Sequence, residues 1–316
     1  MRFQRTIGKI AVTSGPGIHS GKPAGIAIHP APANTGLIFY KISNGVPEAC
    51  PAHIQCLHQT DLCTSLSHNS FQVQTVEHLL SALSGLEIDN AYLELNGNEI
   101  PALDGSSAPF VELLQEAQIV EQAAPRTYVK IIRPISITHG EKSISVHPSS
   151  LPKISYSIDY DHPLIQSQSH VYHASPSAFQ RSIASARTFA FKNEIEGLWA
   201  KGLGMGGTLD NTLVFSETEL LNDTGLRYPD ECVRHKILDL IGDLALLGLP
   251  VIGHFVAKRS GHRLHAELVT AILKNPGSWI LINTDVEGAE SIPCPLPVRE
   301  STLSALPKPQ PALSPQ

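Results

Sequence analysis

The stretch Cys232-Val-Arg-His-Lys-Ile-Leu-Asp-Leu-Ile-Gly-Asp243 predicts a helix with one buried face. Its apolar residues recur at intervals of three and four, which is the period of an amphipathic helix. His235, Asp239 and Asp243 stand at i, i+4 and i+8, so their side chains stack along one stripe of that helix. The apolar residues are Val233, Ile237, Leu240, Ile241 and Leu244.

This stripe is a candidate metal site, because an imidazole and a carboxylate one turn apart can bind the same first-row metal ion. Zinc takes such nitrogen and oxygen ligands at about 2.0–2.2 Å. The alternative is a solvated helix face that carries ordinary charges, and a single His-x3-Asp pair does not separate the two.

A second predicted helix, over residues 75–85, carries Glu77 and His78. Catalytic zinc sites keep three protein ligands and one open position for water. His78, His235 and Asp239 would complete such a set. Adjacent residues on a helix diverge by about 100°, which lets Glu77 flank the metal without binding it. The chain contains no H-E-x-x-H, so the usual metallopeptidase signature is absent.

The composition bounds the class of protein. The 316 residues suffice for two domains, each with its own core. The 23 basic and 29 acidic residues include no basic run, which argues against nucleic-acid binding. No apolar stretch is long enough to span a bilayer, and the N-terminal MRFQRTIGKIAV lacks the apolar core of a signal peptide. We therefore expect a cytoplasmic protein.

The five cysteines form no paired framework, which suits a reducing compartment. Three of them lie near histidines between residues 50 and 68, but their spacing is not that of a zinc knuckle or ribbon. That segment alternates like strands, so we expect no structural zinc site there.

Both halves combine strands with helices, which indicates an α+β fold of two similar domains. In each half a helix bears a histidine and runs to a Gly-Leu pair, and the first of these glycines, Gly85, would cap its helix. Each domain should pack β-sheets against a pair of helices, with the two helix layers facing each other and the active site at the domain junction. The expected parts are an N-terminal domain at 1–122 that contributes Glu77 and His78, a linker over 121–126, a C-terminal domain at 127–300, and a disordered proline-rich tail at 301–316.

Gly202-Leu-Gly-Met-Gly-Gly207 matches the G-x-G-x-x-G dinucleotide fingerprint. That fingerprint requires a strand before it and a helix after it, whereas here a helix-like segment precedes and a strand follows. We interpret the segment as a flexible glycine turn.

Several motifs together resemble one enzyme family. They are QRTIGKI…GIHSGK…PAPANTG (4–36), TVEHLLSAL (75–83), IPALDGSSAPF (100–110), ARTF (186–189), GLGMGG (202–207), GLRYPDECVRHKILDLIGDL (225–244) and SGH (260–262). Taken in order over residues 4 to 285, they are similar to the UDP-3-O-acyl-N-acetylglucosamine deacetylases, the zinc enzymes of the committed step of lipid A synthesis. One departure is Ser65, where many members have a second cysteine.

The resemblance implies a role for each matched position. One zinc ion per chain would be bound by His78, His235 and Asp239, with Glu77 as the general base. His265 is a rival for the role of His262, but the family match favours His262. The proton for the departing amine would come from His262 or Glu77. The remaining implied roles are His262 as the second acid/base residue, Asp243 as the carboxylate that orients it, and Thr188 and Lys236 as stabilisers of the oxyanion.

The family also implies a hydrophobic passage for the 3-O-acyl chain, built from an insert near residues 191–214. The alternative for the apolar residues there is ordinary helix packing. His19 would lie near the site, and weaker matches assign phosphate and uracil contacts to Lys142, Asp161 and His162. The residues expected to line the passage include Phe189, Phe191, Leu198 and Leu203.

The sequence thus predicts a zinc-dependent amidohydrolase that removes acetate from UDP-3-O-acyl-N-acetylglucosamine, with at most peripheral membrane contact. A zinc peptidase would need neither an acyl passage nor a UDP site. A non-catalytic sugar-nucleotide or lipid-binding protein would lack part of the catalytic set, which is complete here. The ligand set accepts zinc or iron.

Overall fold

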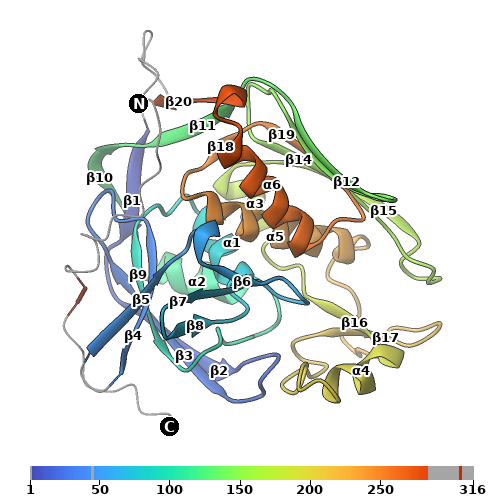
Figure 1. Cartoon of the computed structure of the whole chain (residues 1–316). Coiled ribbons are helices and arrows are strands. Elements are labelled where there is room, and N and C mark those ends of the chain that lie inside the picture. Colours follow the sequence, from blue (N-terminus) through green and yellow to red (C-terminus); the bar gives the residue numbers. More distant parts are fainter. Residues whose placement is uncertain (1, 44–45, 284–305, 308–316) are drawn as a thin grey trace.

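The structure, a computed structural model, describes residues 2–43, 46–283 and 306–307. Within that part, two five-stranded sheets have the same strand order (Figure 1). The first comprises β2 (Ala11–Pro16), β3 (Pro23–Pro30), β9 (Ala91–Asn96), β4 (Leu37–Ser43) and β5 (Val46–Pro51), in that order across the sheet. The second comprises β12 (Ile135–His139), β13 (Lys142–His147), β19 (His254–Lys258), β14 (Lys153–Asp159) and β15 (Ser167–His173).

The pairing directions agree as well as the order. In each sheet the central strand, β9 or β19, pairs antiparallel with one neighbour and parallel with the other. The outer strands complete antiparallel hairpins. The predicted class, two similar α+β domains, is therefore confirmed.

Along the sequence, one of the main helices precedes each central strand and one follows it. α1 packs against α2 in the first unit, α5 packs against α6 in the second, and α1 packs directly against α5. The helices lie between the two sheets (Figure 1), which confirms that the two helix layers face each other. Their bounds are α1 (Glu77–Gly85), α2 (Ala108–Glu116), α5 (Glu231–Leu244) and α6 (His262–Lys274).

The contact between α1 and α5 depends on a glycine. A Cβ atom at Gly242 would lie 2.1 Å from the carbonyl oxygen of Glu77. Glycine inside a helix costs about 1 kcal/mol relative to alanine, so its presence here reflects the close approach of the two backbones. That approach places the start of α1 beside the third and fourth turns of α5.

Gly85 is not the helix cap that the sequence predicted. α1 ends at Gly85, but the cap residue is Leu86, and Gly85 does not adopt positive φ. A Cβ atom there would lie 2.3 Å from the ring of Phe179 in α3 (Pro176–Ser182). The glycine is needed because that ring packs on the helix backbone.

The linker predicted over residues 121–126 is instead mostly strand. β10 (Ile119–Pro125) pairs antiparallel with β1 (Phe3–Ile7). The pairing satisfies backbone groups that a free linker would leave to water. Arg126 then binds Asp89 through its Nε at 2.7 Å, and β11 (Thr127–Ile131) begins at the next residue. The chain therefore passes from one unit to the other without a loop.

The shorter elements complete the two units and an insert. β6 (Leu57–Gln59), β7 (Ser65–His68) and β8 (Phe71–Val73) form one sheet, and β18 (Val251–Ile252) and β20 (Trp279–Asn283) flank β11. The insert consists of β16 (Phe189–Phe191), α4 (Lys192–Trp199) and β17 (Leu213–Phe215), and it stands apart from the sheets (Figure 1). The single-turn helices are η1 (Ile54–Cys56), η2 (Ala245–Leu247) and η3 (Pro276–Ser278).

Of the predicted tail, 301–316, only residues 306–307 lie inside the described part. Leu306 packs against a small apolar cluster on the first sheet that includes Ile38 and Tyr40. The predicted disorder concerns residues outside that part. None of the described helices has the length and apolar character needed to cross a membrane.

We predict that Gly242→Ala lowers the free energy of unfolding by about 1–3 kcal/mol, the usual cost of an overpacked contact. The measurement is the midpoint of urea unfolding followed by circular dichroism. Gly197→Ala in α4 is the matched control, because a Cβ atom there meets nothing within 4 Å. Equal stability of the two variants would contradict the close contact at Gly242.

Candidate metal centre and catalytic site

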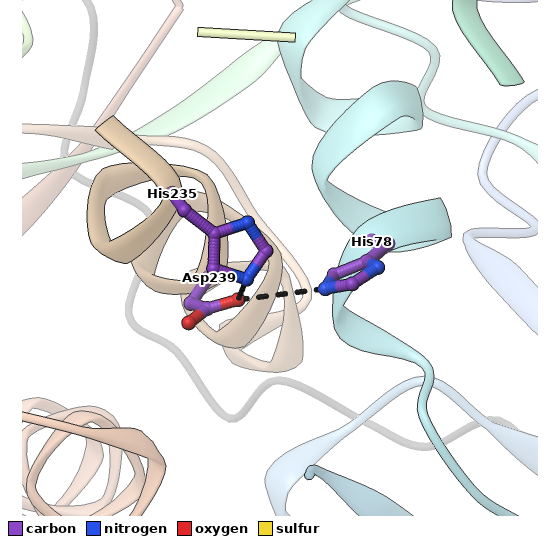
Figure 2. A group of neighbouring side chains, drawn as sticks. All are labelled: His78, His235 and Asp239. Atoms are coloured by element: carbon purple, nitrogen blue, oxygen red, sulfur yellow. Dashed lines mark ion pairs between the residues drawn. The ribbon is translucent and has the colours of Figure 1, made fainter. Parts of the chain in front are cut away.

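The three predicted metal ligands meet where α1 crosses α5 (Figure 2). Asp239 Oδ1 lies 3.2 Å from His235 Nε2 and 3.7 Å from His78 Nε2. One ligand atom from each residue lies within 4.8 Å of the other two, and all three side chains are buried. Two helices from different domains thus contribute to one compact group of donors.

The protonation states suit a metal ion. The Nδ1 of His235 donates to the carbonyl of Ala186 at 3.0 Å, which leaves the Nε2 lone pair directed at Asp239. Burial lowers the pKa of His235 to about 3, so its ring is neutral. Burial alone would raise the pKa of Asp239, but His235 and Lys236 hold it well below its usual range. Neutral imidazoles with a carboxylate are a donor set that zinc accepts.

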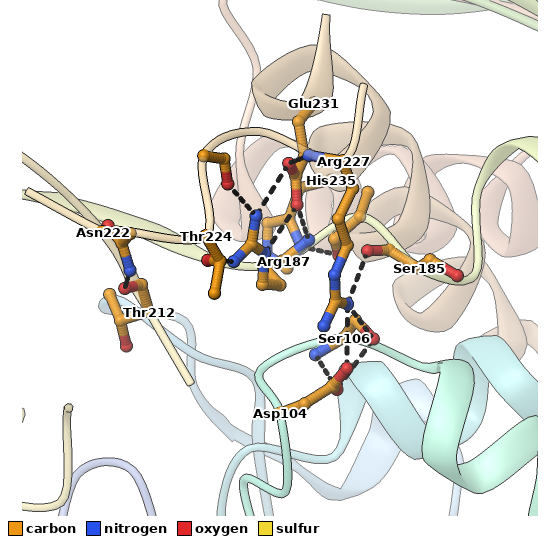
Figure 3. A network of polar contacts seen from close by, with 12 residues as sticks. Asp104, Ser106, Ser185, Arg187, Thr212, Asn222, Thr224, Arg227, Glu231 and His235 are labelled. Carbon is orange, nitrogen blue, oxygen red and sulfur yellow. Dashed lines mark hydrogen bonds and ion pairs between the residues drawn. The ribbon is translucent and has the colours of Figure 1, made fainter. Parts of the chain in front are cut away.

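A buried ion pair fixes the backbone that orients His235 (Figure 3). Glu231 at the start of α5 accepts hydrogen bonds from the Nε of Arg187 at 2.9 Å and from its backbone N–H at 3.0 Å. Arg187 also donates to Thr224 and to the carbonyl of Gly225. Because Ala186 precedes Arg187, this network holds the carbonyl that His235 needs. Such outer contacts orient metal ligands.

A second contact in the same view joins the domains (Figure 3). Arg227 donates to Asp104 Oδ2 at 2.8 Å and to the carbonyl of Ser185 at 2.9 Å. Asp104 comes from the first unit and Arg227 from the second. The IPALDGSS and GLRYPDE motifs therefore meet across the junction, next to the segment that holds His235.

Glu77 lies beside the metal ligands and is fully buried. Its Oε2 accepts the backbone N–H of Thr64 at 3.0 Å. Burial raises the pKa of Glu77 above its ordinary value. A carboxylate with a raised pKa is better matched to accepting a proton near neutral pH than an exposed one.

On the other side of Glu77, Asp243 holds two histidines. Its Oδ2 accepts from the Nδ1 of His262 at 2.8 Å and from the Nδ1 of His265 at 2.7 Å. Burial alone would lower the pKa of His262, but Asp243 raises it to about 9. The reverse holds for His265, whose pKa burial lowers, and whose Nε2 lies 3.2 Å from the Tyr156 hydroxyl. These opposite pKa shifts favour the imidazolium on His262 and the neutral ring on His265.

His19 lies in a turn that Glu99 anchors. Glu99 accepts from the backbone N–H of His19 at 2.8 Å and of Ser20 at 2.9 Å. The His19 ring is close enough to His78 and His262 to interact with their charges, and burial lowers its pKa. The insert docks on the same turn, because the N–H of Gly206 donates to the Ile18 carbonyl at 3.0 Å.

Lys236 contacts a predicted metal ligand, and Thr188 comes two residues after Ala186, whose carbonyl binds His235. Lys236 donates from Nζ to Asp239 Oδ2 at 2.7 Å. Its Nζ is also 5.6 Å from the centroid of the Phe189 ring. Thr188 is held by backbone bonds to Gly105 of the first unit and Leu213 of the insert.

The insert is rich in aromatic contacts; its strand β17 is buried, whereas its helix α4 is exposed to solvent. Phe189 contacts the rings of His235 and Phe191, with centroids 6.4 Å away in both cases. In α4 no residue is buried, and Leu198 and Leu203 are only half-buried. The glycine run 202–207 follows α4 and precedes β17, so it is a turn between helix and strand, as predicted.

The predicted phosphate and uracil contacts, Lys142, Asp161 and His162, lie outside the group of predicted metal ligands. His162 is buried, and its ring nitrogens contact the Ser216 carbonyl and the Leu164 N–H. Its ring lies 5.9 Å from that of Phe191, at the base of the insert. Lys142 and Asp161 are exposed. Within the described part of the chain, no hydrogen bond or ion pair joins these two residues to the metal ligands.

Comparison with known proteins identifies the family. A family profile described as LpxC, UDP-3-O-acyl N-acetylglycosamine deacetylase, matches residues 4–274. The chain belongs to this family. The UDP-3-O-acyl-N-acetylglucosamine deacetylase of Anaeromyxobacter sp. (strain Fw109-5) is 46% identical over 274 residues, which are 87% of this chain and 90% of that protein. The protein of the same name from Shewanella frigidimarina (strain NCIMB 400) is 43% identical over 290 residues, or 91% and 95% of the two chains.

The site of this deacetylase-family chain contains groups that the sequence did not single out. Arg187 and Glu231 were visible only as parts of motifs, and Thr64 only as the neighbour of Ser65. What marks them is a buried charge or hydroxyl, and the spacing of residues in a sequence does not reveal burial.

A cavity of about 1250 Å³ also opens at the far ends of α1 and α5, beside Gly85 and Leu244, away from the predicted catalytic side chains.

We predict that Asp243→Asn lowers the pKa of His262 from about 9, because it removes the largest charge that favours the imidazolium. In the parent protein this pair adds stability that is complete below about pH 6.5 and is lost as pH rises through the folded-state pKa. The measurement is an NMR titration of ¹⁵N-labelled histidines. Asp159→Asn, at the exposed end of β14, is the control, and an unshifted His262 in Asp243→Asn would refute the assignment.

Proposed function

We propose that the chain hydrolyses the N-acetyl group of UDP-3-O-acyl-N-acetylglucosamine, releasing acetate and UDP-3-O-acyl-glucosamine in the committed step of lipid A biosynthesis. One observation carries the proposal. Three buried donors that could bind one metal ion, His78, His235 and Asp239, adjoin the buried carboxylate of Glu77 and the imidazole of His262, whose pKa is raised, and all five residues lie on α1, α5 or the start of α6. Membership of the deacetylase family supplies the substrate.

The residues present fit one zinc ion per chain, held by His78, His235 and Asp239. Iron would accept the same ligands. When bound, zinc would lower the pKa of water towards about 7 and polarise the acetyl carbonyl.

The protein's own groups divide the proton transfers. Glu77 would take a proton from the attacking water, because its pKa is raised by burial and its Oε2 is held by Thr64. Amide cleavage also needs a proton on the departing nitrogen. His262 carries such a proton at neutral pH, and Glu77 carries one after the first transfer. We assign the delivery to one of these two.

Positive charge and a hydroxyl would stabilise the oxyanion that forms on the acetyl carbon. Lys236 provides an ammonium group that Asp239 holds in place. Thr188 immediately precedes β16 and follows Ala186, whose carbonyl binds His235, by two residues. His262 adds a second positive charge. These roles follow from the family match, and the contact of Lys236 with Asp239 supports the role of Lys236.

The acyl chain would lie along the insert. Phe189 and Phe191 form an aromatic surface that begins at His235, and the half-buried Leu198 and Leu203 would extend it. His19, Lys142, Asp161 and His162 remain predicted contacts for the sugar nucleotide. A cytoplasmic location with at most peripheral membrane contact remains our prediction from the sequence.

We predict that acetate release from UDP-3-O-acyl-N-acetylglucosamine stops after chelation and returns when one equivalent of zinc is added. The measurement is acetate formation with metal content followed in parallel. Activity that survives chelation would keep the substrate and remove the metal from the mechanism. No activity in zinc-loaded protein would favour a sugar-nucleotide or lipid-binding protein, and hydrolysis of peptides instead would indicate a zinc peptidase.

We predict that Glu77→Gln retains zinc and loses most of its turnover, by about 10²–10⁴-fold, the range of general acid–base catalysis. Glutamine keeps an oxygen that can accept the Thr64 N–H, so the fold should persist. The measurement is kcat together with the amount of zinc bound per chain, each compared between Glu77→Gln and the parent protein. Turnover near that of the parent would remove Glu77 as the base.

A further inference from the structure

We propose that Thr64 is a positioning residue, which fixes the Glu77 carboxylate of one domain relative to the Asp243–His262 pair of the other. The inference rests on the proposed function, because these are the groups that exchange protons in that reaction. In the described part of the chain, the hydrogen bonds of Thr64 go to Glu77, Asp243, His262 and Val76 rather than to the predicted metal ligands. It acts through the residues that it binds.

Thr64 contacts all three groups directly. Its backbone N–H donates to Glu77 Oε2 at 3.0 Å. Its hydroxyl lies 2.5 Å from Asp243 Oδ1 and 3.3 Å from His262 Nδ1. Thr64 is only 1% exposed and Asp243 only 2%, so bulk water does not replace these contacts. One residue thus links the two proton-transferring sides of the site.

The direction of each hydrogen bond follows from the acceptor. An ionised carboxylate only accepts, so the Thr64 hydroxyl donates to Asp243 Oδ1. Asp243 Oδ2 already accepts from the Nδ1 atoms of His262 and His265. The three donors therefore satisfy both oxygens of a buried carboxylate, as such groups require. Since the His262 Nδ1 proton is directed at Asp243, its Nε2 is the nitrogen left for the reaction.

The backbone of Thr64 also anchors the start of α1. Its carbonyl accepts the N–H of Val76 at 3.2 Å, and Val76 immediately precedes α1. The amide and carbonyl of Thr64 thus hold the turn that carries Glu77 and His78. Its hydroxyl reaches 179 residues along the chain to Asp243. The backbone amide and the hydroxyl of Thr64 together thus connect the proposed base to the pair that carries the proposed acid.

The test is Thr64→Val, which keeps the shape and removes the hydroxyl. We expect kcat for acetate release to fall by about 10²-fold, the usual effect of small misplacements of reacting groups, with little change in KM. Thr64→Ser restores the hydroxyl and should recover most of kcat. Thr6→Val is the matched control, because the buried Thr6 hydroxyl bonds the Asn90 carbonyl at 2.8 Å away from the site.

A second readout does not depend on turnover. In the full-length protein, with and without zinc, the ¹⁵N and ¹H resonances of the His262 and His265 Nδ1–H groups should shift in Thr64→Val and stay in place in Thr6→Val. If the parent protein releases no acetate, the proposed function fails while these resonances still decide the placement of Thr64. Unshifted resonances in Thr64→Val, equal kcat losses in Thr64→Val and Thr6→Val, or no recovery in Thr64→Ser would overturn the proposal.

Discussion

The close packing of α1 on α5 is the constraint on which the site depends. At Gly242 no side chain separates α5 from the Glu77 carbonyl. Because protein interiors are as closely packed as organic crystals, this contact fixes the positions of the neighbouring side chains. The proposed ligands His78 and Asp239 come from different helices, so their separation is set by this crossing. A wider crossing would leave two half-sites with the same residues and no common centre.

Around that crossing, three buried carboxylates each have a basic partner. Glu231 binds Arg187, Asp239 binds Lys236, and Asp243 binds His262. A buried charge without a partner costs several kcal/mol, so each match makes one arrangement of the neighbouring backbone much more favourable than its alternatives. The charges to which we assign a role in the reaction are held in the same way as the structural pair of Arg187 and Glu231.

The sequence was sufficient for elements with local signals. The stripe His235-x3-Asp239-x3-Asp243 predicted the helix and the shared face of these three side chains, since helical spacing alone determines which side chains share a face. The sequence was insufficient where the role of a residue depends on a contact with a residue far away in the chain. The strand character of 121–125 depends on pairing with β1, the packing at Gly85 depends on Phe179, and Thr64 is explained only by Asp243. The assignments of Glu77, Thr188 and Lys236 needed the family resemblance, because isolated polar residues have no characteristic spacing.

The matching order of the two five-stranded sheets has a consequence for how such a site can originate. Each sheet places one histidine-bearing helix, α1 or α5, before its central strand. Two copies of one ancestral unit, joined as a symmetric homodimer, would therefore bring two equivalent imidazoles to their shared axis. The third proposed ligand, Asp239, comes from α5 alone, so the donor set and the separate roles proposed for Glu77 and His262 both require that symmetry to be lost. Fusion of the copies into one chain is the step that lets each half change separately.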